Sequence, residues 1–408
     1  MKQIFFIIIV FIGFNSCFVK DESKLMTGVN SPITLSDSSE FSQGVFFTSD
    51  NNENPVIVWS SAKSDSGKYT LNYRLFDDNK KDFGVINKVA ETKGMQAHHE
   101  SMAKLGFKKN GDMIAVYRRE NTISKRRFAG ELFFVESSDR GYTWGNEGKL
   151  VSDTTSSSQS FYDVARLANG EIGLTWLDSR KIEEREGSSI FFNQTSSTGG
   201  FVKEVGVVGS TCQCCRTELE VDKFGKINIA FRDILNDSIR DMVYVFSENN
   251  GASFSKGKRI SNDNWIIKGC PHTGPSIATN NNQRAIAWYT MGGGKGVYFT
   301  VGHNASESSP ERILIDQNAT HPQMIWAKDH FYLCYELRSS FKGAIYRQIV
   351  VTLITRKGLI HKTIQVSDTG IDSQMPVISL VDEKHLIIAW VENNGNHQSI
   401  IKAKLIKI

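Results

Sequence analysis

The sequence contains little proline and no segment typical of a linker between domains. Only 7 of its 408 residues are proline, and no Pro/Gly/Ser-rich stretch or block of like charge divides it. A chain of this length would ordinarily form two or three domains. Without a linker, a single array in which each structural unit packs against the next explains the length better.

The chain also lacks an excess of charge of one sign. Its 48 Lys and Arg residues nearly balance 44 Asp and Glu residues, and the formal net charge is +4. The two signs are interspersed along the sequence. Nucleic-acid-binding domains instead concentrate Lys and Arg in a basic stripe. We therefore expect no nucleic-acid partner.

The N-terminus carries an apolar run that is too short to cross a bilayer as an ordinary helix. The run covers residues 4–14, follows Lys2, and precedes Asn15, Ser16 and Cys17. A spanning helix needs about 20 apolar residues, whereas this order of charge, apolar run and small residue is typical of a secretory signal. The segment resembles a bacterial lipoprotein signal, which implies that residues 1–17 end in a lipidated Cys17. A simple secretory signal cleaved nearby is the alternative.

The lipoprotein resemblance implies a location and a domain division. We expect a tether over residues 18–30 and a single domain over residues 31–408. The protein would lie in the cell envelope, in the periplasm or on the cell surface, with the lipid on Cys17 as its contact with the membrane.

Seven similar β-rich runs recur along the chain, and no segment shows a convincing helical period. Each run follows another apolar segment and a turn, and ends in an aromatic residue with a charge nearby. The runs are residues 55–61, 112–120, 171–180, 226–233, 284–290, 331–338 and 385–393. A strand-forming unit that repeats every 45–60 residues is typical of a β-propeller.

We therefore predict an all-β fold, a β-propeller of four-stranded antiparallel blades. Seven blades are expected, and six with one irregular insertion is the alternative. The last unit ends after three strands, so we expect a strand over residues 32–35 to complete it. This pairing would close the ring and remove an exposed sheet edge. A monomer is expected.

A turn motif narrows the fold further. Residues 137–144 read Ser-Ser-Asp-Arg-Gly-Tyr-Thr-Trp, and residues 247–254 are a degenerate copy. Asp or Asn binds the turn backbone, Gly takes the positive φ, and the aromatic packs between sheets. The motif resembles the Asp-box of the sialidase superfamily, which implies structural roles for Asp139 and Trp144. Residues 211–290, with their Cys-x-Cys-Cys sequence, also resemble an uncharacterised bacterial subgroup of sialidase-fold proteins.

Propeller geometry predicts where polar residues gather. The first strand of each blade starts, and the second ends, at the same face of the ring, around one central mouth. Starts of first strands supply His98, His99, Glu100, Tyr162, Asp163, residues 212–218, Cys270, Pro271, His272, His321 and Gln374. Ends of second strands supply residues 117–120, Trp176, Asp178, Arg180, Arg232, Asp233, Tyr289, Tyr335, Glu336, Arg338, Trp390 and Glu392. Carboxylates, arginines and aromatics together suit a polar, anionic or sugar-like ligand.

The sialidase resemblance implies roles for some of these residues. Glu218 opens one strand and Arg232 closes the next, which is similar to the Glu-then-Arg segment of the family. The resemblance implies an exo-glycosidase-like site with an arginine triad, a tyrosine nucleophile and an aspartic acid. The corresponding candidates are Arg118, Arg232 and Arg338, then Tyr335 with Glu218 and Glu336, and then Asp163 or Asp178. No Arg-Ile-Pro occurs near the N-terminus and residues 289–292 contain no arginine, so binding of an acidic glycan without hydrolysis remains an alternative.

Four cysteines open the first strands of two consecutive blades. They are Cys212, Cys214, Cys215 and Cys270, and we expect them to meet at the mouth. Outside the cytoplasm disulfides are the default, so no cofactor is expected. The alternative is a copper or zinc site in which thiolates act with His272, or with His98 or His99. A third possibility for the whole chain is a non-catalytic scaffold that binds a protein partner.

Overall fold

The computed structural model describes residues 26–408 except 29, 65–67, 153–156, 304–310 and 394–397. Its strands form seven antiparallel sheets. One turn of 3-10 helix at Ala90–Thr92 is the helical element among the described residues. That part of the chain contains no helix with the length and apolarity needed to cross a membrane. Cys17 and most of the proposed tether lie outside the described residues.

Each sheet is one blade, and its strands follow one another outward from the centre. Blade 1 comprises β3 (Phe41–Ser49), β4 (Pro55–Ala62), β5 (Thr70–Asp77), β6 (Asp82–Phe83) and β7 (Asn87–Val89). Blade 2 comprises β8 (Lys104–Phe107), β9 (Met113–Glu120), β10 (Gly130–Ser137) and β11 (Gly148–Lys149). Blade 3 comprises β12 (Gln159–Arg166), β13 (Ile172–Asp178), β14 (Ser188–Gln194) and β15 (Val205–Thr211).

The remaining blades repeat this order. Blade 4 comprises β16 (Glu218–Val221), β17 (Ile227–Arg232), β18 (Met242–Ser247) and β19 (Lys258–Arg259). Blade 5 comprises β20 (Ser276–Thr279), β21 (Gln283–Thr290), β22 (Gly296–His303) and β23 (Ile313–Asp316). Blade 6 comprises β24 (Ala319–Ala327), β25 (His330–Phe341), β26 (Ala344–Thr355) and β27 (Ile360–Gln365). Blade 7 comprises β28 (Ser373–Asp382), β29 (His385–Asn393) and β30 (Ser399–Lys407), with β1 (Thr27–Gly28) and β2 (Ile33–Thr34) beside β30.

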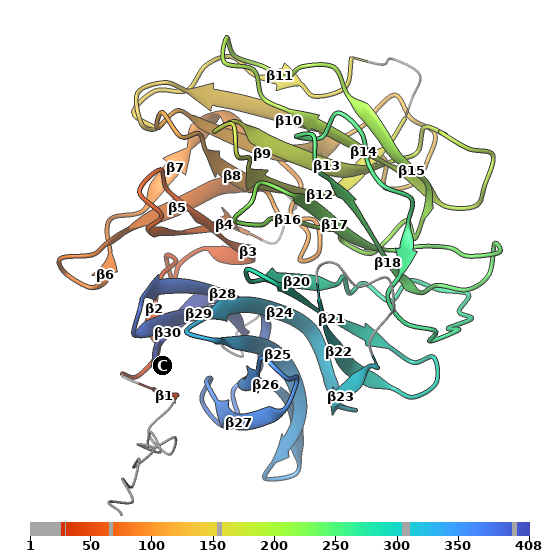
Figure 1. The fold of residues 1–408 in the computed structure, drawn as a ribbon. Coiled ribbons are helices and arrows are strands. Elements are labelled where there is room, and N and C mark those ends of the chain that lie inside the picture. The colour runs from red at the N-terminus through yellow and green to blue at the C-terminus, as the bar shows by residue number, and fades with distance from the viewer. Residues whose placement is uncertain (1–25, 29, 65–67, 153–156, 304–310, 394–397) are drawn as a thin grey trace, which may run out of the picture.

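The seven blades form a closed ring. The first strands contact one another in sequence, from β3 to β8, β12, β16, β20, β24 and β28, and β28 contacts β3 again. Outer strands such as β6, β11 and β27 lie at the periphery (Figure 1). The predicted seven-bladed propeller is therefore confirmed, and each of the seven predicted β-rich runs overlaps the second strand of a blade.

The N-terminal segment completes the last blade, as the sequence predicted. Ile33 pairs with Ala403 of β30, and Figure 1 shows β2 beside that strand. Leu35 then donates its backbone N–H to the carbonyl of Ile401 at 2.8 Å. The backbone N–H of Ile401 in turn donates to Ser36 Oγ at 2.9 Å. The two ends of the described chain are thus joined within one sheet.

Apolar side chains fill the spaces between blades. The buried hydrophobic residues form seven clusters, and each cluster joins two consecutive blades. The aromatic residues near the ends of second strands belong to these clusters. Trp59, Trp176, Trp288 and Trp390 are fully buried in this way. Because each sheet is covered on both faces, the second strands are apolar along most of their length.

The Asp-box forms the turn between β10 and β11. Asp139 Oδ1 accepts hydrogen bonds from Ser137 Oγ and from the backbone N–H of Thr143, both at 2.8 Å. Gly141 has φ +85°, a conformation that glycine adopts without strain. Trp144 packs against the cluster between blades 1 and 2. These contacts are confined to the turn and the adjacent core, in agreement with the expected structural role.

A substitution in the closing segment tests how much this pairing stabilises the ring. Leu35 is fully buried between blades 7 and 1, whereas Ile33 is 41% exposed. We expect Leu35→Ala to lower the free energy of unfolding by about 2–5 kcal/mol, because it leaves a cavity at the junction of the chain ends. Ile33→Ala, the matched control two residues away, should cost less than about 1 kcal/mol. Urea denaturation of both variants measures the difference, and equal losses would contradict this account of closure.

Candidate functional site

A buried arginine lies where several blades meet at the centre of the ring. Arg216 lies in the loop before β16 and is 5% exposed. Its guanidinium pairs with the carboxylate of Glu100, which precedes blade 2, at 3.2 Å. It also donates to the carbonyls of Pro275 at 3.1 Å and Pro322 at 3.0 Å, at the starts of blades 5 and 6. One side chain therefore links the inner ends of four blades.

A histidine and a second glutamate extend this network. His321 Nδ1 lies 3.1 Å from Glu336 Oε2, and its Nε2 lies 3.8 Å from Glu100 Oε1. Burial disfavours the charged imidazole, but the carboxylates of Glu336 and Glu100 outweigh this effect and raise the pKa of His321 to about 8. The His321 side chain is 17% exposed, so a protonated imidazole reaches solvent from an otherwise buried network.

Two further carboxyl groups lie beside this network, and their environments differ. Asp163 pairs with Lys104 at 2.9 Å and accepts a hydrogen bond from the backbone N–H of Leu219 at 2.9 Å. Glu218 has no such close cation, since the nearest guanidinium nitrogen of Arg216 is 4.0 Å away. Burial and the Asp163 carboxylate raise the pKa of Glu218 to about 8. Glu218 is therefore protonated at neutral pH, while its side chain remains 19% exposed.

Bulges in the inner strands shape this central region. The pairing of the first two strands shifts register in blades 1, 3, 6 and 7. Residues with positive φ lie at these shifts, namely Gly44, Phe161, His321 and Met375. At two bulges a backbone N–H points to a side chain of the preceding blade. The N–H of Phe161 donates to Ser101 Oγ at 3.0 Å, and that of Met375 donates to Glu336 Oε1 at 2.6 Å. The bulges thus bond neighbouring blades while aiming polar groups at the centre.

The candidate arginine triad is not brought together. Arg118 and Arg232 each follow a buried aromatic near the end of a second strand and reach the next blade. Arg118 Nε donates to the carbonyl of Gln159 at 2.9 Å, and Arg232 donates to that of Tyr289 at 2.8 Å. Arg338 is exposed, and no ion pair of the described residues includes it. A shared anion pocket built from these three guanidinium groups is therefore not formed.

Tyr335 and Asp178 also lie away from the central network. Successive strand residues face opposite sides of a sheet, so Tyr335 faces blade 5 while Glu336 faces blade 7. Its hydroxyl lies 3.1 Å from Thr352 Oγ1 within the cluster between blades 5 and 6. Asp178 is fully buried and accepts hydrogen bonds from Trp176 Nε1 at 3.1 Å and Arg180 Nε at 3.0 Å. Of the candidate catalytic residues, the structure therefore groups Glu218, Asp163 and Glu336.

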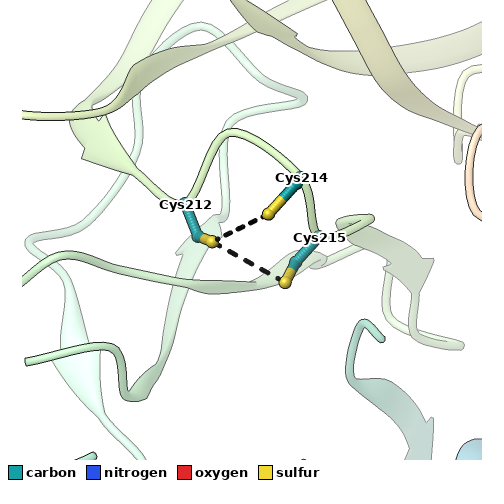
Figure 2. A group of neighbouring side chains, drawn as sticks. All are labelled: Cys212, Cys214 and Cys215. Carbon is teal, nitrogen blue, oxygen red and sulfur yellow. Dashed lines mark hydrogen bonds between the residues drawn. The ribbon is translucent and has the colours of Figure 1, made fainter. Parts of the chain in front are cut away.

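Three of the four expected cysteines form a cluster in the loop before β16. Cys212 Sγ lies 3.6 Å from Cys214 Sγ and 3.7 Å from Cys215 Sγ (Figure 2). Cys270 is an exposed free cysteine. The prediction that Cys270 and His272 join the cluster is therefore not met, because the possible ligand group among the described residues consists of the three neighbouring sulfurs. All described cysteines carry free thiols, including Cys334, which is buried in the core between blades 6 and 7.

The sequence analysis placed Glu100, His321 and residues 212–218 at the mouth, but it did not select Arg216, Glu100 or His321 as candidate catalytic residues. Arg216, Glu100 and His321 all lie just before or at the start of an inner strand, where mouth residues were expected. The arginines selected from the resemblance instead lie at the ends of second strands. The position of Arg216, Glu100 and His321 at or before the first strands was the signal in the sequence that could have identified them.

Comparisons with known proteins support the fold. No family model matches the chain, and no curated protein matches it in sequence. The polysaccharide lyase Uly1 is similar with a TM-score of 0.56 at 12% identity, over 92% of each chain. A protein of unknown function from Dyadobacter fermentans is similar with a TM-score of 0.53 at 10% identity, over 94% of this chain and 99% of that one. The Hadza microbial sialidase Hz136 gives a TM-score of 0.50 at 12% identity, over 86% of this chain and 76% of that one.

Identities this low establish shared architecture and nothing finer. A polysaccharide lyase and a sialidase are thus both similar to this chain over most of its length. The chain is therefore a seven-bladed β-propeller with a sialidase-like fold.

Proposed function

We propose that this protein binds an acidic glycan at the central network and hydrolyses a glycosidic bond. Glu218 protonates the leaving-group oxygen as general acid, and a water molecule attacks the anomeric carbon. The observation that carries the proposal is the position of Glu218, a partly exposed carboxyl group beside Asp163 whose closest cation is 4.0 Å away. Its carboxyl has a pKa of about 8 and still reaches solvent. A carboxyl group that keeps its proton at neutral pH is what protonation of a leaving-group oxygen requires.

The neighbours of Glu218 supply the other requirements of this chemistry. Burial raises the pKa of Glu218, and the carboxylate of Asp163, which pairs with Lys104, raises it further. Pairs of carboxyl groups whose environments separate their pKa values are typical of acid/base sites. His321, with a pKa of about 8, provides a positive charge that reaches solvent and can attract an anionic sugar substituent.

The proposed chemistry differs from a tyrosine-nucleophile mechanism. Tyr335 packs in the core between blades 5 and 6, and burial raises the pKa of its hydroxyl to about 12. A buried neutral phenol with a hydrogen-bonded hydroxyl is a weak nucleophile. The proposal therefore assigns the proton-transfer role to Glu218 and gives Tyr335 no part in the reaction.

The lipid anchor is a second proposal about the same protein. We propose that the Cys17 thiol is lipidated and that the propeller lies outside the cytoplasm. The support is the resemblance of residues 1–17 to a lipoprotein signal. Metabolic labelling with a fatty-acid analogue should label the native chain and not Cys17→Ser. Labelling of both proteins, or of neither, would contradict the anchor.

Substitution of Glu218 tests the catalytic role. Purified protein is assayed for release of reducing ends from sialylated, uronic-acid-containing and sulfated glycans, with neutral glycans alongside. Glu218→Gln should lower kcat about 100-fold or more with little change in KM, because an amide cannot donate the proton. Glu220→Gln is the matched control on the same strand and should keep kcat within about threefold of the native value. Equal effects of both substitutions, or no turnover of any acidic glycan by the native protein, would refute the proposed reaction.

The same carboxyl group predicts a pH dependence of stability. Folding raises the pKa of Glu218 from 4.5 to about 8, so the folded chain holds a proton that the unfolded chain loses above pH 4.5. Unfolding then releases a proton, and the contribution of Glu218 to stability falls as pH rises from 4.5 to about 8. Glu218→Gln removes this contribution. Its free energy of unfolding relative to the native protein should therefore rise across that interval, and parallel pH profiles in urea denaturation would show that the pKa is not raised.

A further inference from the structure

The cysteine cluster between blades 3 and 4 is a chemical group that the proposed glycan reaction does not use. Cys212, Cys214 and Cys215 are 1%, 7% and 2% exposed, and they belong to the apolar cluster between these two blades. Their sulfurs converge from a single short loop (Figure 2). Three thiols held together in a buried site require an explanation beyond packing, because separated cysteines pack equally well.

The distances between the sulfurs match those in a metal–thiolate site. Cys212 Sγ lies 3.6 and 3.7 Å from the other two sulfurs, and all three lie within 4.8 Å of one another. Thiolates bound at about 2.3 Å to one ion are about 3.8 Å apart in tetrahedral and about 4.0 Å apart in trigonal geometry. Bonded sulfurs in a disulfide are about 2.05 Å apart. The cluster thus has room for a single ion among its three sulfurs.

A buried positive charge lies next to the cluster. Arg232 is 1% exposed, and its hydrogen bonds go to the carbonyls of Arg240, Tyr289 and Thr273. Its Nε is buried and has no hydrogen-bond partner among the described residues. No carboxylate pairs with Arg232 or Arg240 among the ion pairs of that part of the chain. Burying a guanidinium group without an anion costs free energy, so a negative charge nearby would stabilise Arg232.

The two arginines are close enough to act on the sulfurs. Arg232 interacts electrostatically with Cys215, and Arg240 interacts electrostatically with Cys212. The backbone also joins the two groups, since the N–H of Cys212 donates to the carbonyl of Arg232 at 2.8 Å. The site therefore combines three sulfur ligands with two positive charges that lack carboxylate partners in the described structure.

We propose that Cys212, Cys214 and Cys215 bind one monovalent copper ion as a three-coordinate thiolate site. Soft sulfur ligands select Cu(I), whereas zinc sites are almost always four-coordinate. No imidazole or carboxylate joins the three sulfurs in the ligand group found among the described residues. Binding releases three thiol protons to solvent and transfers no electron. Three thiolates and one Cu(I) carry a charge of −2, which Arg232 and Arg240 neutralise. This site is independent of the proposed glycan reaction.

Anaerobic titration of the reduced native protein with Cu(I), in competition with a coloured Cu(I) chelator, tests the proposal. We expect one equivalent of copper to bind tightly, with a thiolate-to-copper charge-transfer band in the ultraviolet. Cys212→Ser, Cys214→Ser and Cys215→Ser should each weaken the affinity at least about 100-fold. Cys270→Ser, the exposed cysteine outside the cluster, is the matched control and should keep full binding.

A second variant guards against loss of folding in the serine variants. Arg240→Gln keeps all three sulfurs and should weaken Cu(I) binding several-fold, because it removes one neutralising charge. Native mass spectrometry of protein purified without reductant shows whether the cluster contains a disulfide instead of a metal ion. A disulfide within the cluster, preferential binding of zinc over Cu(I) to the reduced protein, or unchanged Cu(I) affinity in the three serine variants would each overturn the proposal.

Discussion

The ion pair between Glu100 and Arg216 is the contact on which the centre of the molecule depends. The inner strands of a propeller surround a central axis, and in this protein buried charged side chains occupy the space around it. Arg216 binds a carboxylate before blade 2 and carbonyls at the starts of blades 5 and 6. Removing either member of a buried pair leaves the other charge uncompensated, at a cost of about 3–5 kcal/mol. The pair therefore makes the positions of four blades interdependent, which apolar contacts between neighbouring blades alone would not do.

The same network fixes the protonation of the proposed site. Buried carboxylates cannot all remain ionised close together, so the available cations decide which of them carry charge. Lys104 pairs with Asp163, and His321 lies between Glu336 and Glu100. The closest cation to Glu218 is Arg216, at 4.0 Å, and burial raises the pKa of Glu218 to about 8. Its availability as an acid is thus a consequence of how the inner strands share their positive charges.

The cysteine loop connects the second proposed site to this network. Cys215 directly precedes Arg216, and the loop bears no regular secondary structure of its own. An ion held by three thiolates would fix the conformation of the loop that delivers the axial guanidinium. Binding energy for such an ion would then contribute to the stability of the folded ring, because the unfolded chain holds no preformed site.

The sequence by itself determined the architecture, because the features that specify a propeller are local. The repeated β-rich runs, the Asp-box of residues 137–144 and the strand at residues 32–35 each follow from neighbouring residues, and the structure has them where they were predicted. Neighbouring residues do not determine which side chains of a strand reach the centre. A shift of one residue separates Tyr335 in the core from Glu336 at the centre. Bulges at Phe161, His321 and Met375 alter that alternation within single strands. Only the tertiary structure decided that Arg216, rather than Arg118 or Arg232, reaches the axis, and that Cys270 lies apart from the other cysteines. Those outcomes depend on contacts between blades that are distant in sequence, where burial and the pairing of charges select one arrangement.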